Sequence, residues 1–206
     1  MLELARRFGS VSSSVHAGVW DREAAMGTEL YGQTLGIVGL GDIGVRLAKR
    51  AQAFGMRLLA HDPAVHASTF AVQDYGVTLC NLDKLLNEAD FVSLHVPLLD
   101  STRHLLNKER LEQMKPSAYL INTARGGLVD ESALARALQE GKLAGAALDV
   151  REQEPPPQPD PLSGLKNLIL TPHIAGVTEA SLERAALHVS EDVLRVLRGE
   201  RPISPV

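Results

Sequence analysis

Short apolar segments alternate with longer helical patterns along most of this 206-residue chain. Six of these segments have the length and composition of strands, and several are apolar without interruption, which is typical of strands buried on both faces of a parallel sheet. They begin at Thr34, Met56, Phe91, Ala118, Gly145 and Leu168. The alternation therefore predicts an α/β fold, a doubly wound parallel sheet with helices on both faces.

Helical spacing of apolar residues predicts what connects the strands. The predicted connecting helices span 43–54, 82–88, 108–114 and 131–140. Leu2 to Phe8 also has a helical pattern, and Glu179 to Leu197 has the apolar stripe of a long amphipathic helix. Residues 9–31 show no strand pattern, and the prolines between 155 and 161 predict an irregular loop.

Composition excludes several classes of protein. A net charge of −4 and an aromatic content of 4% argue against a nucleic-acid partner, which needs cations and stacking surfaces. Cys80 is the one cysteine, so neither an internal disulfide nor a cysteine-based zinc site is possible, and no His/Asp/Glu spacing predicts a metal. No apolar run has the length of a membrane span, and the charged N-terminus is unlike a signal peptide. We expect a soluble, cytoplasmic protein.

The segment from Gly39 to Gly44, Gly-Leu-Gly-Asp-Ile-Gly, fits the pattern G-x-G-x-x-G. It follows a predicted strand and opens a predicted helix, which is the context that a dinucleotide-binding turn requires. Gly39 permits the tight turn, Gly41 lets the backbone approach a pyrophosphate, and Gly44 lets helix and strand pack closely. The amide groups of Asp42 and Ile43 then belong to a helix N-terminus, which favours phosphate. The alternative is a tight turn that binds no ligand.

Asp62 stands at the end of the next predicted strand, close to the spacing of about 20 residues expected for a carboxylate that binds a ribose 2′-hydroxyl. A carboxylate there repels a 2′-phosphate, and no arginine directly follows it. The sequence therefore predicts NAD as the cofactor in preference to NADP. The alternative is that Asp62 is a plain turn residue before Pro63.

Three ionisable residues follow three later strands: Arg125, Glu154 and His173. Because ligands of open parallel sheets bind beyond the carboxyl ends of the strands, these side chains are expected at one edge of the sheet. Together they offer an acid–base pair and a cation for a carboxylate. Taken singly, each has a simpler interpretation, respectively a surface charge, a solvated acid and a capping residue.

Four stretches resemble the D-isomer-specific 2-hydroxyacid dehydrogenase family, which includes phosphoglycerate, hydroxypyruvate/glyoxylate and D-lactate dehydrogenases. They span 29–44, 114–131, 147–155 and 171–176, in the family's order and over nearly the whole chain. The resemblance implies an NAD-binding Rossmann fold and an oxidoreductase, EC 1.1.1.-, that transfers a hydride between nicotinamide and a D-2-hydroxy acid/2-oxo acid pair.

The resemblance also implies roles for individual residues. Arg125 is similar to the family's substrate-carboxylate arginine, His173 to its acid/base, and Glu154 to the acid that pairs with that histidine. In the reducing direction His173, kept protonated by Glu154, would give a proton to the 2-oxo oxygen. Besides the glycine turn and Asp62, the residues expected by similarity to line the cofactor are Pro97, Thr102, Thr123, Ala124, Arg125, Asp149, His173 and Gly176.

One position departs from the family pattern. The residue after Asp149 and Val150 is commonly aromatic in the family, whereas here it is Arg151. Arg151 either changes the packing at the rim of the site or adds a positive charge for an acidic substrate.

The resemblance implies a second, substrate-binding lobe, and this sequence starts at the cofactor lobe. We interpret the chain as lacking most of that lobe, whether by design, proteolysis or a start at an internal Met, with nucleotide binding kept and turnover reduced. The expected division is 1–31 as an N-terminal helix and extended dimerisation segment, 32–177 as the dinucleotide-binding domain, and 178–206 as a C-terminal helix that returns to the missing lobe. A homodimer is expected.

Other functions remain open at this point. A non-catalytic NAD-sensing or corepressor-like relative shares the fold, but would be expected to have lost the Arg, Glu and His that this chain keeps. An NAD-binding fragment without turnover is a further alternative. A different Rossmann enzyme would keep Gly39–Gly44 but lack the sequences around Arg125 and His173.

Overall fold

The computed structural model describes residues 1–204, which form two compact units. The first unit comprises residues 1–171 and contains the sheet, and the second begins at Pro172.

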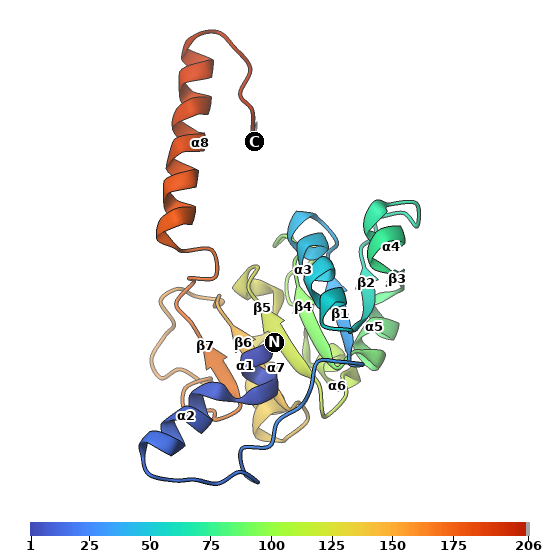
Figure 1. Ribbon diagram of the computed structural model, residues 1–206, viewed down its shortest axis with the longest axis vertical. Helices are drawn as coiled ribbons and strands as arrows, with labels where there is room; N and C mark the ends of the chain where they lie inside the picture. The colour runs from blue at the N-terminus through green and yellow to red at the C-terminus, as the bar shows by residue number, and fades with distance from the viewer. Residues whose placement is uncertain (205–206) are drawn as a thin grey trace. The chain divides into compact units, whose positions relative to one another are not determined.

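Seven parallel strands form the sheet of the first unit, in the order β3-β2-β1-β4-β5-β6-β7 (Figure 1). The strands are β1 (Thr34–Val38), β2 (Arg57–His61), β3 (Val77–Leu79), β4 (Phe91–Leu94), β5 (Tyr119–Asn122), β6 (Gly145–Leu148) and β7 (Leu168–Leu170). Ile37 in β1 pairs with Ala60 on one side and with Ser93 on the other, so β1 lies between β2 and β4. The predicted doubly wound parallel sheet is confirmed.

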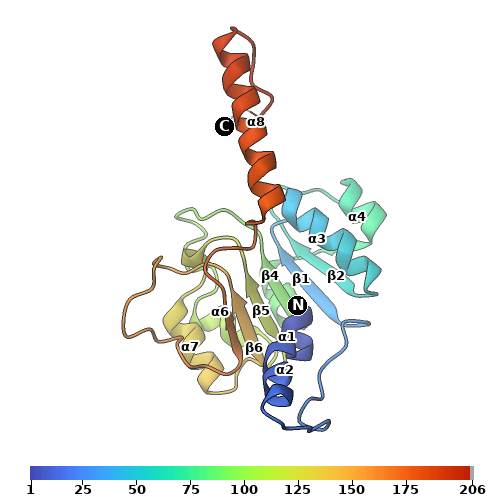
Figure 2. The same cartoon turned by 60° about the vertical axis from the view of Figure 1, so that its left-hand side comes forward.

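Helices cover both faces of this sheet. The helices of the first unit are α1 (Leu2–Arg6), α2 (Phe8–His16), α3 (Asp42–Ala53), α4 (Phe70–Tyr75), α5 (Leu82–Glu88), α6 (Lys108–Gln113) and α7 (Glu131–Gln139). Buried residues of α1, α3 and α4 form one core with one face of the strands, as Figure 2 shows for α1 and α3. Residues of α5, α6 and α7 form a second core with the other face.

The alternation of side chains along each strand separates these two cores. In β1, Leu35 and Ile37 belong to the core with α3, whereas Val38 belongs to the core with α5. All five residues of β1 are buried. Such burial on both faces explains why the strand has no polar side chain after Thr34.

Two elements of the sheet layers were not predicted from the sequence. The strand β3 is only three residues long, with Thr78 exposed between two apolar neighbours, and α4 is a helix of six residues. Neither is long enough to produce a clear periodicity. They complete the expected β-α-β order between β2 and α5.

The prediction of an extended segment after Phe8 is wrong for its first part, because α2 is a helix. None of its residues is buried. Instead, its serines satisfy backbone carbonyls: Ser13 Oγ donates to Gly9 O at 2.8 Å and Ser14 Oγ to Ser10 O at 3.0 Å. A helix with three adjacent serines and no buried residue lacks the apolar stripe from which a helix is predicted.

The second unit contains the helix α8 (Glu179–Leu197), with the bounds predicted from the sequence. Thr178 and Ser181 form a capping box at its N-terminus. Asp192 accepts hydrogen bonds from the backbone of Ile203 and Ser204, which brings the end of the described chain alongside the helix. No residue of α8 is buried.

None of the helices within residues 1–204 combines the length and the apolar character that a membrane span requires. In the same residues, no three His, Cys, Asp or Glu side chains are grouped so that they could hold a metal ion.

Candidate functional site

The strand order reverses direction between β1 and β4, so the carboxyl ends of these two strands mark the point where the connections diverge. From β1 the chain crosses over through α3 to β2, whereas β4 lies on the opposite side of β1 and leads towards β5. Connections that leave neighbouring strands in opposite directions open a gap between them, and open α/β sheets bind their ligands in that gap. The loops after β1, β2, β4, β5 and β6 all reach this edge, because every strand of the sheet runs in the same direction.

The glycine turn after β1 shows the close packing that its sequence predicts. Gly39 has a φ of +94°, and a Cβ on it would lie 2.8 Å from the backbone of His95. A Cβ on Gly44 would collide with the carbonyl oxygen of Gly39. Gly41 is different, because a Cβ there would have no heavy atom within 4 Å. Gly39 and Gly44 are therefore required by the fold, whereas the space beside Gly41 is open to a ligand.

The N-terminus of α3 faces this open space. Gly41 is the N-cap residue, and within the described part of the chain no side chain caps the first turn. The first amide groups of a helix carry a partial positive charge, which favours a phosphate. The turn therefore offers both room and hydrogen-bond donors to a pyrophosphate.

Asp62 is fixed beside the glycine turn by two backbone amides. Its Oδ2 accepts a hydrogen bond from Leu40 N at 2.8 Å, and its Oδ1 accepts one from Ala64 N at 2.9 Å. A carboxylate has about four acceptor positions, so further donors can bind to it. The contact with Leu40 places the acid next to the turn, as a ribose adjoining the pyrophosphate requires.

The loop after β4 is organised by Thr102. Its Oγ1 donates to Pro97 O at 2.7 Å and accepts from Leu99 N at 2.8 Å. Both Pro97 and Thr102 were predicted to line the cofactor, and these bonds give Thr102 a role in shaping the loop that carries Pro97.

His95, between β4 and this loop, is a half-buried histidine whose surroundings the sequence did not indicate. One of its ring nitrogens, Nε2, lies 2.9 Å from Ser93 Oγ. Burial lowers the pKa of His95 to about 4, so the ring is neutral at neutral pH.

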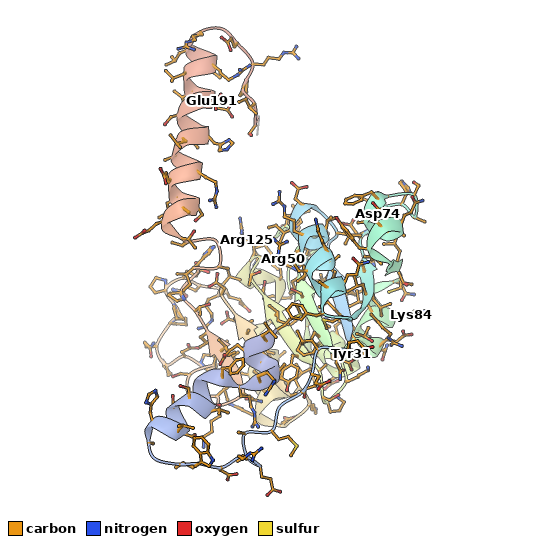
Figure 3. All side chains as sticks on the ribbon, in the orientation of Figure 1. Tyr31, Arg50, Asp74, Lys84, Arg125 and Glu191 are labelled. Carbon is orange, nitrogen blue, oxygen red and sulfur yellow. The ribbon has the colours of Figure 1, made fainter. Side chains whose placement is uncertain are left out.

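The turn after β5 carries Arg125 at the same edge of the sheet (Figure 3). Asn122, which is 1% exposed, closes this turn: its Nδ2 donates to Arg125 O at 2.9 Å, and its Oδ1 accepts from Ala124 N at 3.0 Å. Thr123 and Arg125 are exposed as a result. A short 3-10 helix, Gly126–Leu128, follows. The sequence indicated Arg125 but gave no sign that Asn122 holds it.

The segment after β6 carries two acids in different surroundings. Asp149 is 5% exposed and accepts a hydrogen bond from Thr171 Oγ1. Glu154 is exposed, and its Oε1 accepts a hydrogen bond from Arg151 N at 2.9 Å.

Arg151 is bound within the protein, so the idea that it provides a charge for an acidic substrate is wrong. Its side chain is only 8% exposed and forms ion pairs with Glu131 and Asp160. Arg151 therefore affects the packing at the rim of the site, which was the second interpretation offered by the sequence. Neither partner could be predicted, because nothing in the local sequence relates 131 or 160 to 151.

Two of the predicted site residues, His173 and Gly176, belong to the second unit. His173 is exposed and has a φ of +57°. Gly176 O accepts a hydrogen bond from Ser181 Oγ at 2.6 Å, which joins this segment to the first turn of α8. The other predicted residues lie in the first unit, on loops that leave the carboxyl ends of its strands.

A separate hollow of about 830 Å³ lies between the N-terminal segment and β7. Its lining includes Arg7, Gly27 and Lys166. Asn167, which directly precedes β7, also lines it, so the hollow opens at the amino end of that strand. Because the glycine turn, Asp62 and Arg125 are all at the carboxyl ends, we assign the functional site to that edge.

Two glycine substitutions separate ligand binding from folding. We expect Gly41→Val to weaken NADH binding by about a hundredfold, because the valine side chain would displace the pyrophosphate from the turn. The loss of stability should stay below about 1 kcal/mol, since only the N-cap is altered. Gly44→Ala should instead lower the free energy of unfolding by about 1–3 kcal/mol, because the added methyl group overpacks the turn.

Fluorescence titration with NADH and urea unfolding of both variants measure these effects. Unchanged NADH affinity in a folded Gly41→Val variant would show that the pyrophosphate does not lie at the glycine turn.

The half-buried His95 makes the free energy of unfolding depend on pH. Its folded pKa of about 4 is below the ordinary value of 6.5, so between these values the unfolded chain binds a proton that the folded protein does not. The free energy of unfolding should therefore fall as the pH is lowered from 6.5 to 4, by up to about 1.4 kcal/mol per pH unit from this group. Urea unfolding at several pH values measures the slope.

His95→Gln should reduce that slope, whereas His66→Gln, at an exposed position, should leave it unchanged. Equal slopes in the wild type and in His95→Gln would contradict the assignment.

The family model described as "D-isomer specific 2-hydroxyacid dehydrogenase, NAD binding domain" matches residues 1–175. The chain is 52% identical over 183 residues to the (S)-sulfolactate dehydrogenase of Chromohalobacter salexigens, covering 89% of this chain and 59% of that protein. It is 46% identical over 201 residues to the D-3-phosphoglycerate dehydrogenase of Methanocaldococcus jannaschii, covering 97% of this chain and 38% of that protein.

A similar solved structure is the D-lactate dehydrogenase of Aquifex aeolicus complexed with NAD and lactic acid. Its TM-score is 0.87 at 37% identity, with 97% of this chain and 64% of that chain covered. The chain thus spans less than two thirds of the length of each of these three relatives.

Proposed function

Because the chain belongs to the D-isomer specific 2-hydroxyacid dehydrogenase family, within its NAD-binding domain, we propose that its protein transfers a hydride between NAD and a D-2-hydroxy acid/2-oxo acid pair. The observation that carries the proposal is the exposed Arg125 at the edge of the sheet that also holds the glycine turn and Asp62. The substrate class is of the phosphoglycerate, hydroxypyruvate/glyoxylate or D-lactate type.

The residues present fit NAD as the cofactor. The open space beside Gly41 and the uncapped N-terminus of α3 suit a pyrophosphate, and Asp62 has acceptors for the ribose hydroxyls. When bound, the nicotinamide supplies or accepts the hydride. We assign Asp42, Ile43, Pro97 and Thr102 to the same site, and also Thr123, Ala124, Asp149, His173 and Gly176.

The chain's own residues position the substrate and move the proton. Arg125 binds the substrate carboxylate through its planar guanidinium, which orients the reacting carbon. His173 gives its proton to the 2-oxo oxygen during reduction and takes it back during oxidation. By its similarity to the family's pattern, Glu154 is assigned as the acid that pairs with this histidine. These three roles account for the ionisable residues that follow β5, β6 and β7.

We also propose that the protein is a homodimer and acts in the cytoplasm, where NAD is available. Support for the dimer comes from α2 and the loop after it, which present large apolar side chains to solvent. Trp20 is 80% exposed and Met26 is 70% exposed, and Phe8 and Val19 are also exposed. Apolar groups gathered on one segment are typical of an association surface.

Asp62 predicts the choice between the two nicotinamide cofactors. NADH should bind at least about tenfold more tightly than NADPH, because the carboxylate repels a 2′-phosphate at close range. Asp62→Ser should reduce this preference. Calorimetric titration of the chain with each cofactor measures the two dissociation constants, and tighter binding of NADPH by the wild type would refute the assignment.

Substitution of Arg125 should reduce turnover without reducing the affinity for the cofactor. In the natural protein that carries this sequence, Arg125→Lys should lower kcat/KM for 2-oxo acids by about a hundredfold or more, because a lysine lacks the planar fork. The dissociation constant of NADH should stay within about threefold. Arg50→Lys, at an exposed position on α3, is the matched control. Steady-state kinetics with a panel of 2-oxo acids tests this, and full activity of Arg125→Lys would exclude the proposed role.

A further inference from the structure

The buried Arg151 side chain lies between two carboxylates and bonds to both oxygens of each. Its Nε and Nη2 donate to Glu131 Oε1 and Oε2, both at 2.9 Å. Its Nη1 and Nη2 donate to Asp160 Oδ2 and Oδ1, at 3.0 and 2.8 Å. The side chains of Glu131 and Asp160 are 11% and 7% exposed. Two bidentate pairs on one guanidinium fix the plane of that group in two directions.

The two carboxylates tie this guanidinium to separate parts of the first unit. Glu131 is the first residue of α7, and its Oε1 also accepts a hydrogen bond from Glu152 N at 2.7 Å. Asp160 lies at the far end of the proline-rich loop, and its Oδ1 also accepts from Leu162 N at 3.0 Å. The Arg151 guanidinium keeps the pKa of Asp160 below its usual value, so the carboxylate stays charged at neutral pH. Both ends of the loop that contains Glu154 are therefore held by Arg151.

The backbone of Arg151 contacts two segments that carry proposed catalytic groups. Its N–H donates to Glu154 Oε1 at 2.9 Å. Its carbonyl lies directly against Gly126, where an added Cβ would collide with it. Gly126 follows Arg125 in the chain. The backbone of residue 151 thus lies between the Arg125 turn and Glu154 and contacts both, through Gly126 on one side and the Glu154 carboxylate on the other.

We propose that Arg151 is a positioning residue, whose ion pairs with Glu131 and Asp160 fix the backbone that holds Glu154 and the Arg125 turn at a set separation. This role rests on the proposed function, in which Arg125 binds the substrate carboxylate and Glu154 supports the acid. Only arginine offers two bidentate edges, so lysine cannot replace it.

The test uses a variant that removes the ion pairs without leaving buried charge. Arg151→Met alone strands two buried carboxylates, which is a strong cause of unfolding. The triple variant R151M/E131Q/D160N removes all three charges together. The side-chain amide oxygens of the new glutamine and asparagine can still accept the hydrogen bonds from Glu152 N and Leu162 N. Arg151→Lys tests whether a positive charge that cannot form the two bidentate pairs still positions the two segments. Leu138→Ala, at a buried position on α7, provides a control with a comparable loss of stability.

We expect the folded triple variant to lose at least about tenfold in kcat for a 2-oxo acid, because a displacement near 1 Å at a catalytic group has effects of this size or larger. NADH affinity should stay within about threefold. Arg151→Lys should show a loss of the same kind, and Leu138→Ala should keep wild-type kcat well below its unfolding temperature. A triple variant with kcat within twofold of the wild type would overturn the proposal.

A second measurement does not depend on turnover. Amide hydrogen exchange should accelerate in residues 125–128 and 151–154 of the triple variant, because local unfolding of these two segments is enough to expose their amides. Exchange in residues 39–44 should not change. Unchanged exchange in both segments would also overturn the proposal. If the wild-type protein reduces no 2-oxo acid, the proposed function fails, and hydrogen exchange still decides whether Arg151 holds the two segments.

Discussion

The parallel pairing of β1 with β2 on one side and β4 on the other is the constraint on which the rest of the structure depends. Because all seven strands run in the same direction, the segments that follow them reach a common edge. The connections from β1 and β4 diverge next to the glycine turn, which is where open α/β sheets bind their ligands. The placement of Asp62, Thr102, Arg125 and Glu154 follows from this arrangement, although these residues are far apart in the sequence.

The glycine turn shows how one short sequence meets the needs of both folding and binding. Gly39 and Gly44 have no room for a side chain, because each lies against backbone atoms. Gly41 has room and no neighbour, so its lack of a side chain has no packing reason within the first unit. A position kept small with nothing beside it is expected where a ligand approaches the backbone. The pattern G-x-G-x-x-G thus combines two structural requirements with one chemical requirement.

Much of the fold could be predicted from the sequence, because buried parallel strands have continuous apolar sequences. The predicted strand from Thr34 and the helix from Glu179 to Leu197 have the bounds seen in the structure. The elements that were missed have other sources of stability. The strand β3 has three residues and is defined by its pairing with β2, and α2 has no buried residue and so no apolar stripe.

The candidate site divides in the same way. The glycine turn, Asp62 and Arg125 could be predicted, because each follows directly from a motif or from the end of a strand. The groups that hold them could not. Asn122 closes the Arg125 turn from within a strand, and Arg151 finds its partners at Glu131 and Asp160 through the folded chain. The charge of Arg151 suggested a substrate contact, but its burial between two acids shows a structural role.

The central claim is that the cofactor lies at the carboxyl ends of β1 and β2. Amide hydrogen exchange of the chain with and without saturating NADH tests it most directly, since bound ligands slow exchange where they cover the backbone. The account predicts protection in residues 39–44 and 62–64, with no change around Gly27 and Lys166. Protection confined to the hollow between the N-terminal segment and β7, or no protection at the glycine turn, would contradict it.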